Sequence, residues 1–367
     1  MARVETLTDL RLRRLRSGAQ LLHRPKRMRP ESVVQHLVGV QAQVLPSAAL
    51  ALRARTAGLT RASVDRARLE DRSIVLTWAM RGTLHLVSAA DFGRLVPILV
   101  EPHVARSRRR LSQLGVTGAD AERACGLIEA MLEREGPLTR AEIARRLERR
   151  RILTAGQAIA HLMWLAAAER GICFGPDRDG DRTFVLARDW IGTPERAERE
   201  RALADLAVRY LRSHAPATPE DLAAWSGIRL RDARDAWGRA SRRMTEVRTP
   251  AGPMWVPRAK VPAASAGVVR LLGEFDEYLL GWRDRDFAVR PSRRTAINAG
   301  GGLIRPVVLE DGRAVGTWKM ARDSIEVRSF GGLSTSVRRR VAVEGEDVGA
   351  FLETRIDVRF ARSGRSS

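Results

Sequence analysis

The sequence predicts an α+β protein in which three tandem winged helix-turn-helix units stand on a C-terminal β-rich, barrel-like scaffold. Three observations support this prediction. A motif that begins a short helix occurs twice in the middle of the chain, each copy lies between two amphipathic helical patterns, and two short apolar runs that can pair as a hairpin follow each set. Helices followed by a hairpin are the plan of the winged helix-turn-helix.

The repeated motif occupies Gly136–Ala144 in its first copy and Ala215–Ala223 in its second. Each copy places a threonine N-cap before a short helix with an acidic residue in its first turn, which satisfies free backbone N–H groups. The helical patterns on either side of the copies fall at about 119–134, 154–168, 195–213 and 229–241.

Both sets end in a predicted hairpin. In Ile172–Leu186 an Asp-Gly turn separates two apolar runs, whereas the prolines in Thr245–Pro257 predict a looser pair of strands. A third unit opens the chain, with two strands expected at Ile74–Met80 and Gly82–Val87. The helical patterns before these strands fall at about 5–16, 30–41 and 60–70.

From about residue 265, short apolar runs typical of strands replace the helical patterns. These runs are Val268–Phe275, Tyr278–Trp282, Leu303–Glu310, Arg313–Lys319 and Ser324–Ser329. We expect Asn298–Gly302 to be a loop and a helix to follow at about 333–353. The domain boundaries predicted are 1–115, 116–192 and 193–264 for the three winged helices, 265–360 for the scaffold and 361–367 for a disordered tail.

The charge of the chain indicates a polyanionic partner. The 367 residues carry a net charge of +22, and 62 of the 65 basic residues are arginine. Codon bias can exchange lysine for arginine, but it does not produce an excess over the acids, so we expect nucleic acid before a membrane surface. Two cysteines form no disulfide framework and no apolar stretch follows the basic N-terminus, which predicts a cytoplasmic, nucleoid-associated protein.

Several classes of site are not expected. The six histidines are scattered, no His/Cys pair has the spacing of metal ligands, and no Walker loop is present, so we expect no metal and no cofactor. The densest acidic cluster, Glu274–Asp286, is interleaved with Arg283 and Arg285 and predicts structural ion pairs. The longest charge-free window, Ser32–Leu52, contains glutamines, a histidine and a proline, which a bilayer would leave unpaired.

That charge-free window contains Gln41 and Gln43, which precede Pro46. Residues two apart in an extended segment point the same way, so the two amides can face one spot. There they could hold a water molecule through paired donors and acceptors. By composition alone, two polar side chains that finish a helix end are the simpler interpretation.

Four segments make the chain resemble the AlkZ-type winged-helix DNA glycosylases, which remove bulky alkylated purines and can unhook interstrand crosslinks. Gln41-Ala42-Gln43 matches the family's Gln-apolar-Gln catalytic motif, and Trp78–His85 matches its Trp-x-x-Arg-Gly-Thr-x-His segment. Phe275–Gly281 and Gly312–Trp318 resemble its C-terminal signatures. The segments occur in the family's order along essentially the whole chain. Glutamine at position 43, where a related branch has aspartate, resembles the crosslink-resistance branch.

The resemblance implies a C-shaped, monomeric array of winged helices that binds duplex DNA containing alkylated purines. It implies a monofunctional glycosylase in which Gln41 and Gln43 position water and stabilise the oxocarbenium ion. A guanine alkylated at N7 departs as a neutral base, so its release needs no general acid. DNA repair and self-resistance to a DNA-alkylating antibiotic are both compatible with this activity.

The DNA contacts are less sharply defined. Arg81 and His85 could touch phosphate or lesion, or could be satisfied groups packed on a strand. The family has an essential hairpin in its cleft, for which Leu303–Met320 is the candidate here, and this makes Arg313 and Lys319 candidate DNA contacts. Two alternatives stay open, a winged-helix transcription regulator and a non-catalytic binder of damaged DNA. A regulator would usually dimerise, and no dimerising heptad run is visible.

Overall fold

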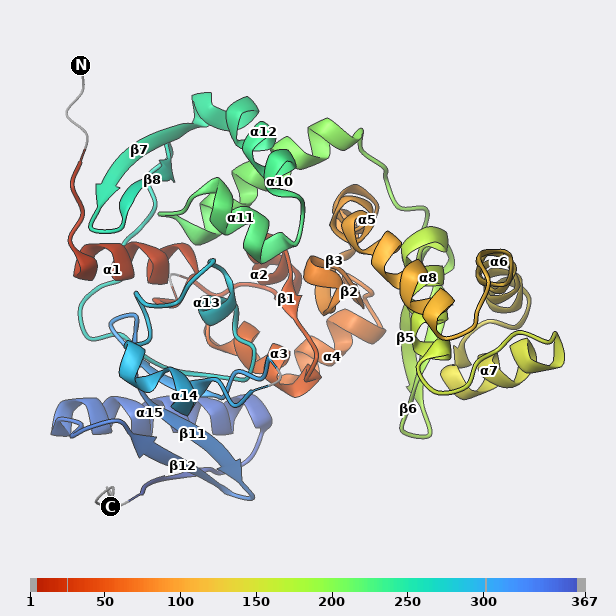
Figure 1. Cartoon of the computed structure of the whole chain (residues 1–367). Helices are drawn as coiled ribbons and strands as arrows, with labels where there is room; N and C mark the ends of the chain where they lie inside the picture. Colours follow the sequence, from red (N-terminus) through yellow and green to blue (C-terminus); the bar gives the residue numbers. More distant parts are fainter. Residues whose placement is uncertain (1–4, 25, 301, 362–367) are drawn as a thin grey trace.

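The computed structural model describes residues 5–24, 26–300 and 302–361 and has a mixed α/β fold (Figure 1). Its N-terminal part surrounds a small sheet with the strand order β1-β3-β2. The three strands are β1 (Val40–Gln41), β2 (Ile74–Trp78) and β3 (Leu84–Ser88). The helices around them are α1 (Asp9–Ala19), α2 (Pro30–Leu37), α3 (Leu45–Arg53) and α4 (Arg61–Leu69). The two expected strands and three of these helices are confirmed, whereas α3 was not predicted.

A long helix, α5 (Ala89–Gln113), links this part to the middle of the chain. The sequence analysis did not predict it, and it contains Pro97 and Pro102, residues that normally interrupt a helix. Its buried side chains belong to the same hydrophobic core as those of the neighbouring helices. Tertiary packing therefore outweighs the local preference against a helix here.

The middle of the chain contains two sets of helices, each followed by a hairpin. The first set is α6 (Gly118–Glu135), α7 (Arg140–Arg149), α8 (Ala158–Arg170), β5 (Ile172–Arg178) and β6 (Asp181–Leu186), with β4 (Leu138–Thr139) paired to β6. After α9 (Ala187–Ile191), the second is α10 (Arg199–His214), α11 (Pro219–Ser226), α12 (Leu230–Ala240), β7 (Met244–Thr249) and β8 (Gly252–Pro257). Thr139 and Thr218 form capping boxes with Glu142 and Asp221, so both predicted helix starts are confirmed.

The C-terminal part is an open sheet of five strands in the order β13-β12-β11-β10-β9, with α15 (Thr335–Leu352) packed against it. The strands are β9 (Val269–Leu272), β10 (Val307–Glu310), β11 (Arg313–Ala321), β12 (Ser324–Ser329) and β13 (Asp357–Phe360). The expected barrel is wrong, because among the described residues β9 and β13 are unjoined edges and no sheet closes. The tail expected from residue 361 lies outside the described residues from 362 onward.

The expected strand at Tyr278–Trp282 is also wrong. The chain there forms the short helix α13 (Glu277–Leu280), because Asp276 caps it by accepting a hydrogen bond from the Tyr278 N–H at 2.9 Å. A second short helix, α14 (Arg294–Ile297), precedes the predicted loop. Both helices lie between the N-terminal part and the sheet (Figure 1).

Figure 1 shows α6 and α7 at one end of the molecule, and α1, β7 and the five-stranded sheet toward the other. One hydrophobic core extends through most of these parts, from Leu22 to Phe351, whereas Leu15 of α1 packs with Leu7 and Val247 in a separate small core. A smaller core lies between the sheet and α15. In the described ranges, no helix combines enough length with enough apolar character to cross a membrane.

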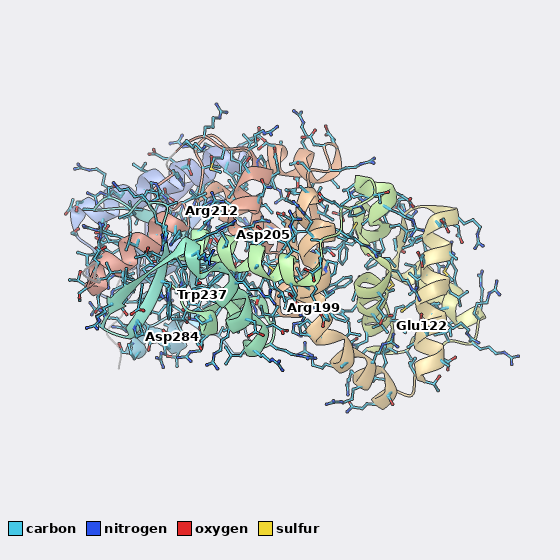
Figure 2. The ribbon with its side chains drawn as sticks, turned by 90° about the horizontal axis from the view of Figure 1, so that it is seen from above. Glu122, Arg199, Asp205, Arg212, Trp237 and Asp284 are labelled. Atoms are coloured by element: carbon cyan, nitrogen blue, oxygen red, sulfur yellow. The ribbon has the colours of Figure 1, made fainter. Side chains whose placement is uncertain are left out.

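Many surface arginines form ion pairs with acidic side chains. Arg199 on α10 pairs with Glu101 at 3.0 Å and with Asp232 at 2.9 Å, and Glu122 on α6 pairs with Arg108 and Arg170. Figure 2 shows Arg199 and Glu122 at well-separated places along the molecule. These pairs leave the net charge of +22 unchanged, but they show which arginines are already engaged with carboxylates.

Candidate active site

The two glutamines follow a sharp helix end. Helix α2 stops at Leu37 because Val38 adopts a left-handed conformation with φ of +71°. The chain then runs extended through β1, where Gln41 pairs with His85 on β3. The Ala42 N–H continues this pairing by donating to the Leu84 carbonyl at 2.7 Å. The expected extended segment beyond a helix end is thus confirmed at Gln41.

Both glutamine amides are held by a donor. Arg81 Nη2 donates to Gln41 Oε1 at 2.7 Å, and the Leu84 N–H donates to Gln43 Oε1 at 2.8 Å. Gln41 is 7% exposed, whereas Gln43 is exposed. An amide oxygen has two lone pairs, so each of these oxygens retains capacity for a second donor such as water.

Arg81 lies on the turn η1 (Met80–Gly82) between β2 and β3, in a left-handed conformation with φ of +57°. Such a conformation is uncommon for a residue other than glycine and persists only where neighbours enforce it. Arg81 Nη1 donates to the Trp225 carbonyl, and Trp164 Nε1 donates to the Gly82 carbonyl at 3.2 Å. Side chains and carbonyls of α8 and α11 therefore hold the turn in place, and Arg81 on this turn holds the Gln41 amide.

Glu277, on α13, lies behind the glutamine segment. Its Oε1 accepts the Gln41 backbone N–H at 2.8 Å, and its Oε2 accepts Trp225 Nε1 at 3.0 Å. The carboxyl is fully buried, and burial raises its pKa, although the positive charge of Arg81 opposes this shift. Glu277 thus connects the segments that contain Gln41, Trp225 and α13, which are distant in the sequence.

The sequence analysis placed Glu277 in an acidic cluster paired with Arg283 and Arg285. The structure pairs other members of that cluster with distant arginines, Asp276 with Arg55 at 2.8 Å and Asp286 with Arg294 at 2.5 Å. No local pattern identified Glu277 as a partner of the glutamines. The only sequence signal was its position in the family-like segment Phe275–Gly281.

His85 is fully buried on β3. Its Nδ1 donates to the Thr83 carbonyl at 2.9 Å, and burial together with the nearby Arg81 charge lowers its pKa to about 3. A neutral, enclosed imidazole does not reach phosphate or base. We therefore leave it out of the DNA contacts and assign it to the support of β1.

Arg313 and Lys319 both lie on β11. Lys319 is exposed and pairs with Glu326 on β12 at 2.9 Å. Arg313 is partly buried, and burial together with the nearby charges of Arg13 and Arg290 lowers its pKa. Among the described residues, no hydrogen bond or ion pair connects either one to Gln41 or Gln43.

The candidate hairpin Leu303–Met320 contains β10 and β11, which are inner strands of the sheet. Its turn is attached to the rest of the molecule, because the Asp311 carboxylate accepts the Gly267 N–H at 2.6 Å and the Gly312 carbonyl accepts the Tyr278 hydroxyl at 3.0 Å. The turn that would have to approach DNA is thus tied to the scaffold, and we assign it no DNA contact.

Two arginines that the sequence analysis did not assign to the site lie near it. The charge of Arg285 is close enough to lower the pKa of Arg81. The charges of Arg106, on α5, and of Arg81 both lower the pKa of His103. Arg81, Arg106 and Arg285 therefore bring positive charge near the turn η1, where the Glu277 carboxyl acts on Arg81 in the opposite direction. Within the described part of the chain, no three His, Cys, Asp or Glu side chains converge to hold a metal ion.

Comparison with known proteins gives a consistent result. Residues 34–351 match the family described as DNA glycosylase AlkZ-like. The chain is 33% identical over 325 residues to the interstrand DNA cross-link repair glycosylase of Streptomyces sahachiroi, covering 81% of this chain and 84% of that protein. It is also similar in structure to Streptomyces sahachiroi DNA glycosylase AlkZ, with a TM-score of 0.83 and 28% identity over 97% of this chain and 100% of that one.

Proposed function

This chain belongs to the AlkZ-like family of DNA glycosylases, and on that premise we propose that it hydrolyses the N-glycosidic bond of bulky N7-alkylguanines in duplex DNA and unhooks interstrand crosslinks. The observation that supports this most directly is the pair of anchored amides at Gln41 and Gln43. The relative's description as a cross-link repair glycosylase supports the choice of substrate.

The leaving group decides which groups the enzyme must supply. Guanine alkylated at N7 is cationic and leaves as a neutral base, so no general acid is required. His85, with a pKa of about 3, is neutral at physiological pH, and Glu277 is buried beneath the backbone of Gln41, so neither is placed to protonate a base. The site has the polar, uncharged amides that such a reaction needs.

As the glycosidic bond breaks, positive charge develops on the sugar. The free lone pairs of Gln41 Oε1 and Gln43 Oε1 accept the two hydrogens of one water and direct its oxygen toward the anomeric carbon. The same amide dipoles stabilise the oxocarbenium charge. Arg81 and the Leu84 N–H hold the oxygens in place, so little reorganisation is needed during the reaction.

The arginines around the turn η1 bind the DNA backbone in this proposal. Arg106 and Arg285 contribute to the positive potential there and would contact phosphates independently of sequence. N7 faces the major groove, so a lesion at this atom is reachable without full base flipping. We propose that the N-terminal helices with β2 and β3, together with the two helix-and-hairpin sets of the middle of the chain, act as three winged helices around one duplex. We also propose that a monomer is sufficient to bind it.

A single-turnover glycosylase assay tests this proposal. Duplexes with one N7-alkylguanine, or with one N7–N7 crosslink, are incubated with purified protein, and free base and abasic sites are measured above the protein-free background. We expect Gln41→Ala and Gln43→Ala each to lower the rate about 100-fold, the scale for losing one positioned dipole, with DNA affinity retained. Gln35→Ala, an exposed glutamine on α2, is the matched control and should leave the rate unchanged.

Base release that survives both substitutions contradicts the role of the pair. A sequence-specific footprint on undamaged DNA without any base release contradicts glycosylase action altogether. Unhooking is scored separately, as strand separation on a denaturing gel, so monoadduct and crosslink activities are resolved in one experiment.

A further inference from the structure

Among the acidic side chains that are buried in the described part of the chain, Glu277 is the one without an arginine partner or a capping role. Three of the others form ion pairs, Asp91 with Arg209, Asp276 with Arg55 and Glu344 with Arg53. Asp221 completes the capping box of α11. Glu277 has two neutral donors instead, the Gln41 N–H at 2.8 Å and Trp225 Nε1 at 3.0 Å.

A buried negative charge without a close countercharge costs free energy, and the hydrogen bonds of Glu277 do not require one. β1 is an edge strand of its sheet, so the outward N–H of Gln41 needs an acceptor, and so does the buried Trp225 indole. A neutral carbonyl or amide oxygen would satisfy both donors. The carboxylate charge therefore needs a reason beyond hydrogen bonding.

Arg81 supplies that reason. Its Nη2 donates to Gln41 Oε1 at 2.7 Å, so a guanidinium lies against the oxygen that holds the water in the proposed mechanism. Arginine stays charged in proteins. A positive charge so close to the reacting sugar opposes formation of the oxocarbenium ion, which the site has to stabilise. A carboxylate on the backbone N–H of the same glutamine acts in the opposite direction.

The charges around Glu277 agree with this account. The charge of Arg81 lowers the pKa of Glu277 against the effect of burial, so the two charges interact although no hydrogen bond joins them. The neighbouring Asp276 is engaged with Arg55, and His85, which pairs with Gln41 from β3, is neutral. Both oxygens of Glu277 accept N–H donors, an arrangement that favours the charged form.

We propose that Glu277 is a positioning residue with a second role, in which its carboxylate offsets the charge of Arg81 at the place where the oxocarbenium ion forms. The inference rests on the proposed function, because it assumes that this ion forms beside Gln41 and Gln43. The amides touch the reacting groups, whereas Glu277 acts from behind the backbone of Gln41.

The test uses two duplexes that each contain a stable analogue of an abasic site. One analogue is a pyrrolidine, which is cationic at neutral pH, and the other is a neutral tetrahydrofuran of nearly the same shape. The pyrrolidine resembles the oxocarbenium ion in charge, so we expect the wild-type protein to bind its duplex more tightly. Glu277→Gln should reduce this preference, the ratio of the two Kd values, at least about tenfold. A loss of positioning alone changes both Kd values equally.

Further variants separate the charge of Glu277 from its hydrogen bonds. Trp225→Phe removes the indole donor but keeps the carboxylate, so the preference should be retained. If Glu277→Gln does not fold because its amide nitrogen faces the indole N–H, the double variant Trp225→Phe/Glu277→Gln takes its place. Glu346→Gln, an exposed acid on α15, makes the same change in net charge and should leave both Kd values unchanged.

A preference that survives Glu277→Gln overturns the proposal, and so does one that is absent from the wild-type protein or already lost in Trp225→Phe. The measurement needs no base release, so this inference and the proposed function fail separately. If the wild-type protein releases no N7-methylguanine, the glycosylase function is contradicted, but a preference that depends on Glu277 still supports the charge assignment. Base release together with a preference independent of Glu277 supports the function and overturns the inference.

Discussion

At the scale of single residues, the site depends on side chains that never meet the substrate in the proposed mechanism. Glu277 accepts one hydrogen bond from the Gln41 backbone and one from the Trp225 indole, both at about the ideal length. Arg81 connects the Gln41 amide to the Trp225 carbonyl. Gln41 is therefore held through its backbone and its side chain by two groups that share Trp225 as a partner.

This arrangement predicts that Arg81 positions Gln41 and does not bind DNA. Lysine at this position offers one compact donor group and cannot serve two acceptors in the geometry of the guanidinium fork. We expect Arg81→Lys to lower the single-turnover rate about 100-fold, the cost of a small misplacement of a reacting group, with DNA affinity within about twofold. If Arg81 instead contacts a phosphate, Arg81→Gln, which removes the charge, will reduce the salt dependence of binding by about one unit of slope, and that result would refute the positioning role.

At the scale of elements, the turn η1 is where three helices meet. Trp164 of α8 bonds to the Gly82 carbonyl, and a Cβ on Gly82 would be 3.5 Å from His103 of α5. Gly227 ends α11 with φ of +83°, next to the backbone of Arg81. The geometry of the glutamines is thus set by α5, α8 and α11, which come from different parts of the chain.

Gly227 allows a test at this scale. A Cβ there would lie 2.8 Å from His103 Nε2 and 3.0 Å from the Arg81 backbone, whereas Gly171, which ends α8 with φ of +66°, has open space around it. Alanine at either position costs about 1 kcal/mol of unfolding free energy because φ is positive. We expect both variants to lose that stability in urea melts, but only Gly227→Ala to lose glycosylase activity. Equal activity in the two would show that the turn tolerates displacement.

A second observation at this scale concerns α8, the third helix of its set. Most of its side chains are buried, and it packs between α5 and α6. In a winged helix this is the element that enters the major groove. Here most of its side chains lie in the hydrophobic core, which leaves little of α8 free to enter a groove.

For the whole molecule, the positive charge and the histidines act together. The pKa of each of the six histidines is lowered, in every case chiefly by burial and with nearby arginines adding to the effect. The folded state therefore binds fewer protons than the unfolded chain below about pH 6.5. Stability must fall as the pH decreases through that value.

The size of this effect follows from His85. With a pKa of about 3 in the folded state and about 6.5 when unfolded, it costs about 1.4 kcal/mol of unfolding free energy at pH 5.5 relative to pH 7.5. The pKa of His214, also fully buried, is shifted in the same direction. Urea melts at the two pH values should show the fall, and His85→Asn should reduce it by about 1.4 kcal/mol. A pH-independent stability in the wild-type protein would contradict this account.

Much of the local structure follows from the sequence, because helix starts and hairpin turns satisfy their hydrogen bonds with near neighbours. The capping boxes at Thr139 and Thr218 are examples. Distant packing prevailed in the proline-containing α5, whereas α13, expected to be a strand, depends on the local cap at Asp276.

The sequence by itself determined the family, the basic character and the glutamine pair, since these reside in composition and in short motifs. Only the tertiary structure placed Glu277 beneath Gln41, 236 residues away, and brought Trp78 against Phe174 and Phe184. The physical reason is that a buried carboxylate or an aromatic wall gains its energy from partners remote in the chain. No local pattern of residues specifies such partners, and only the folded molecule brings them together.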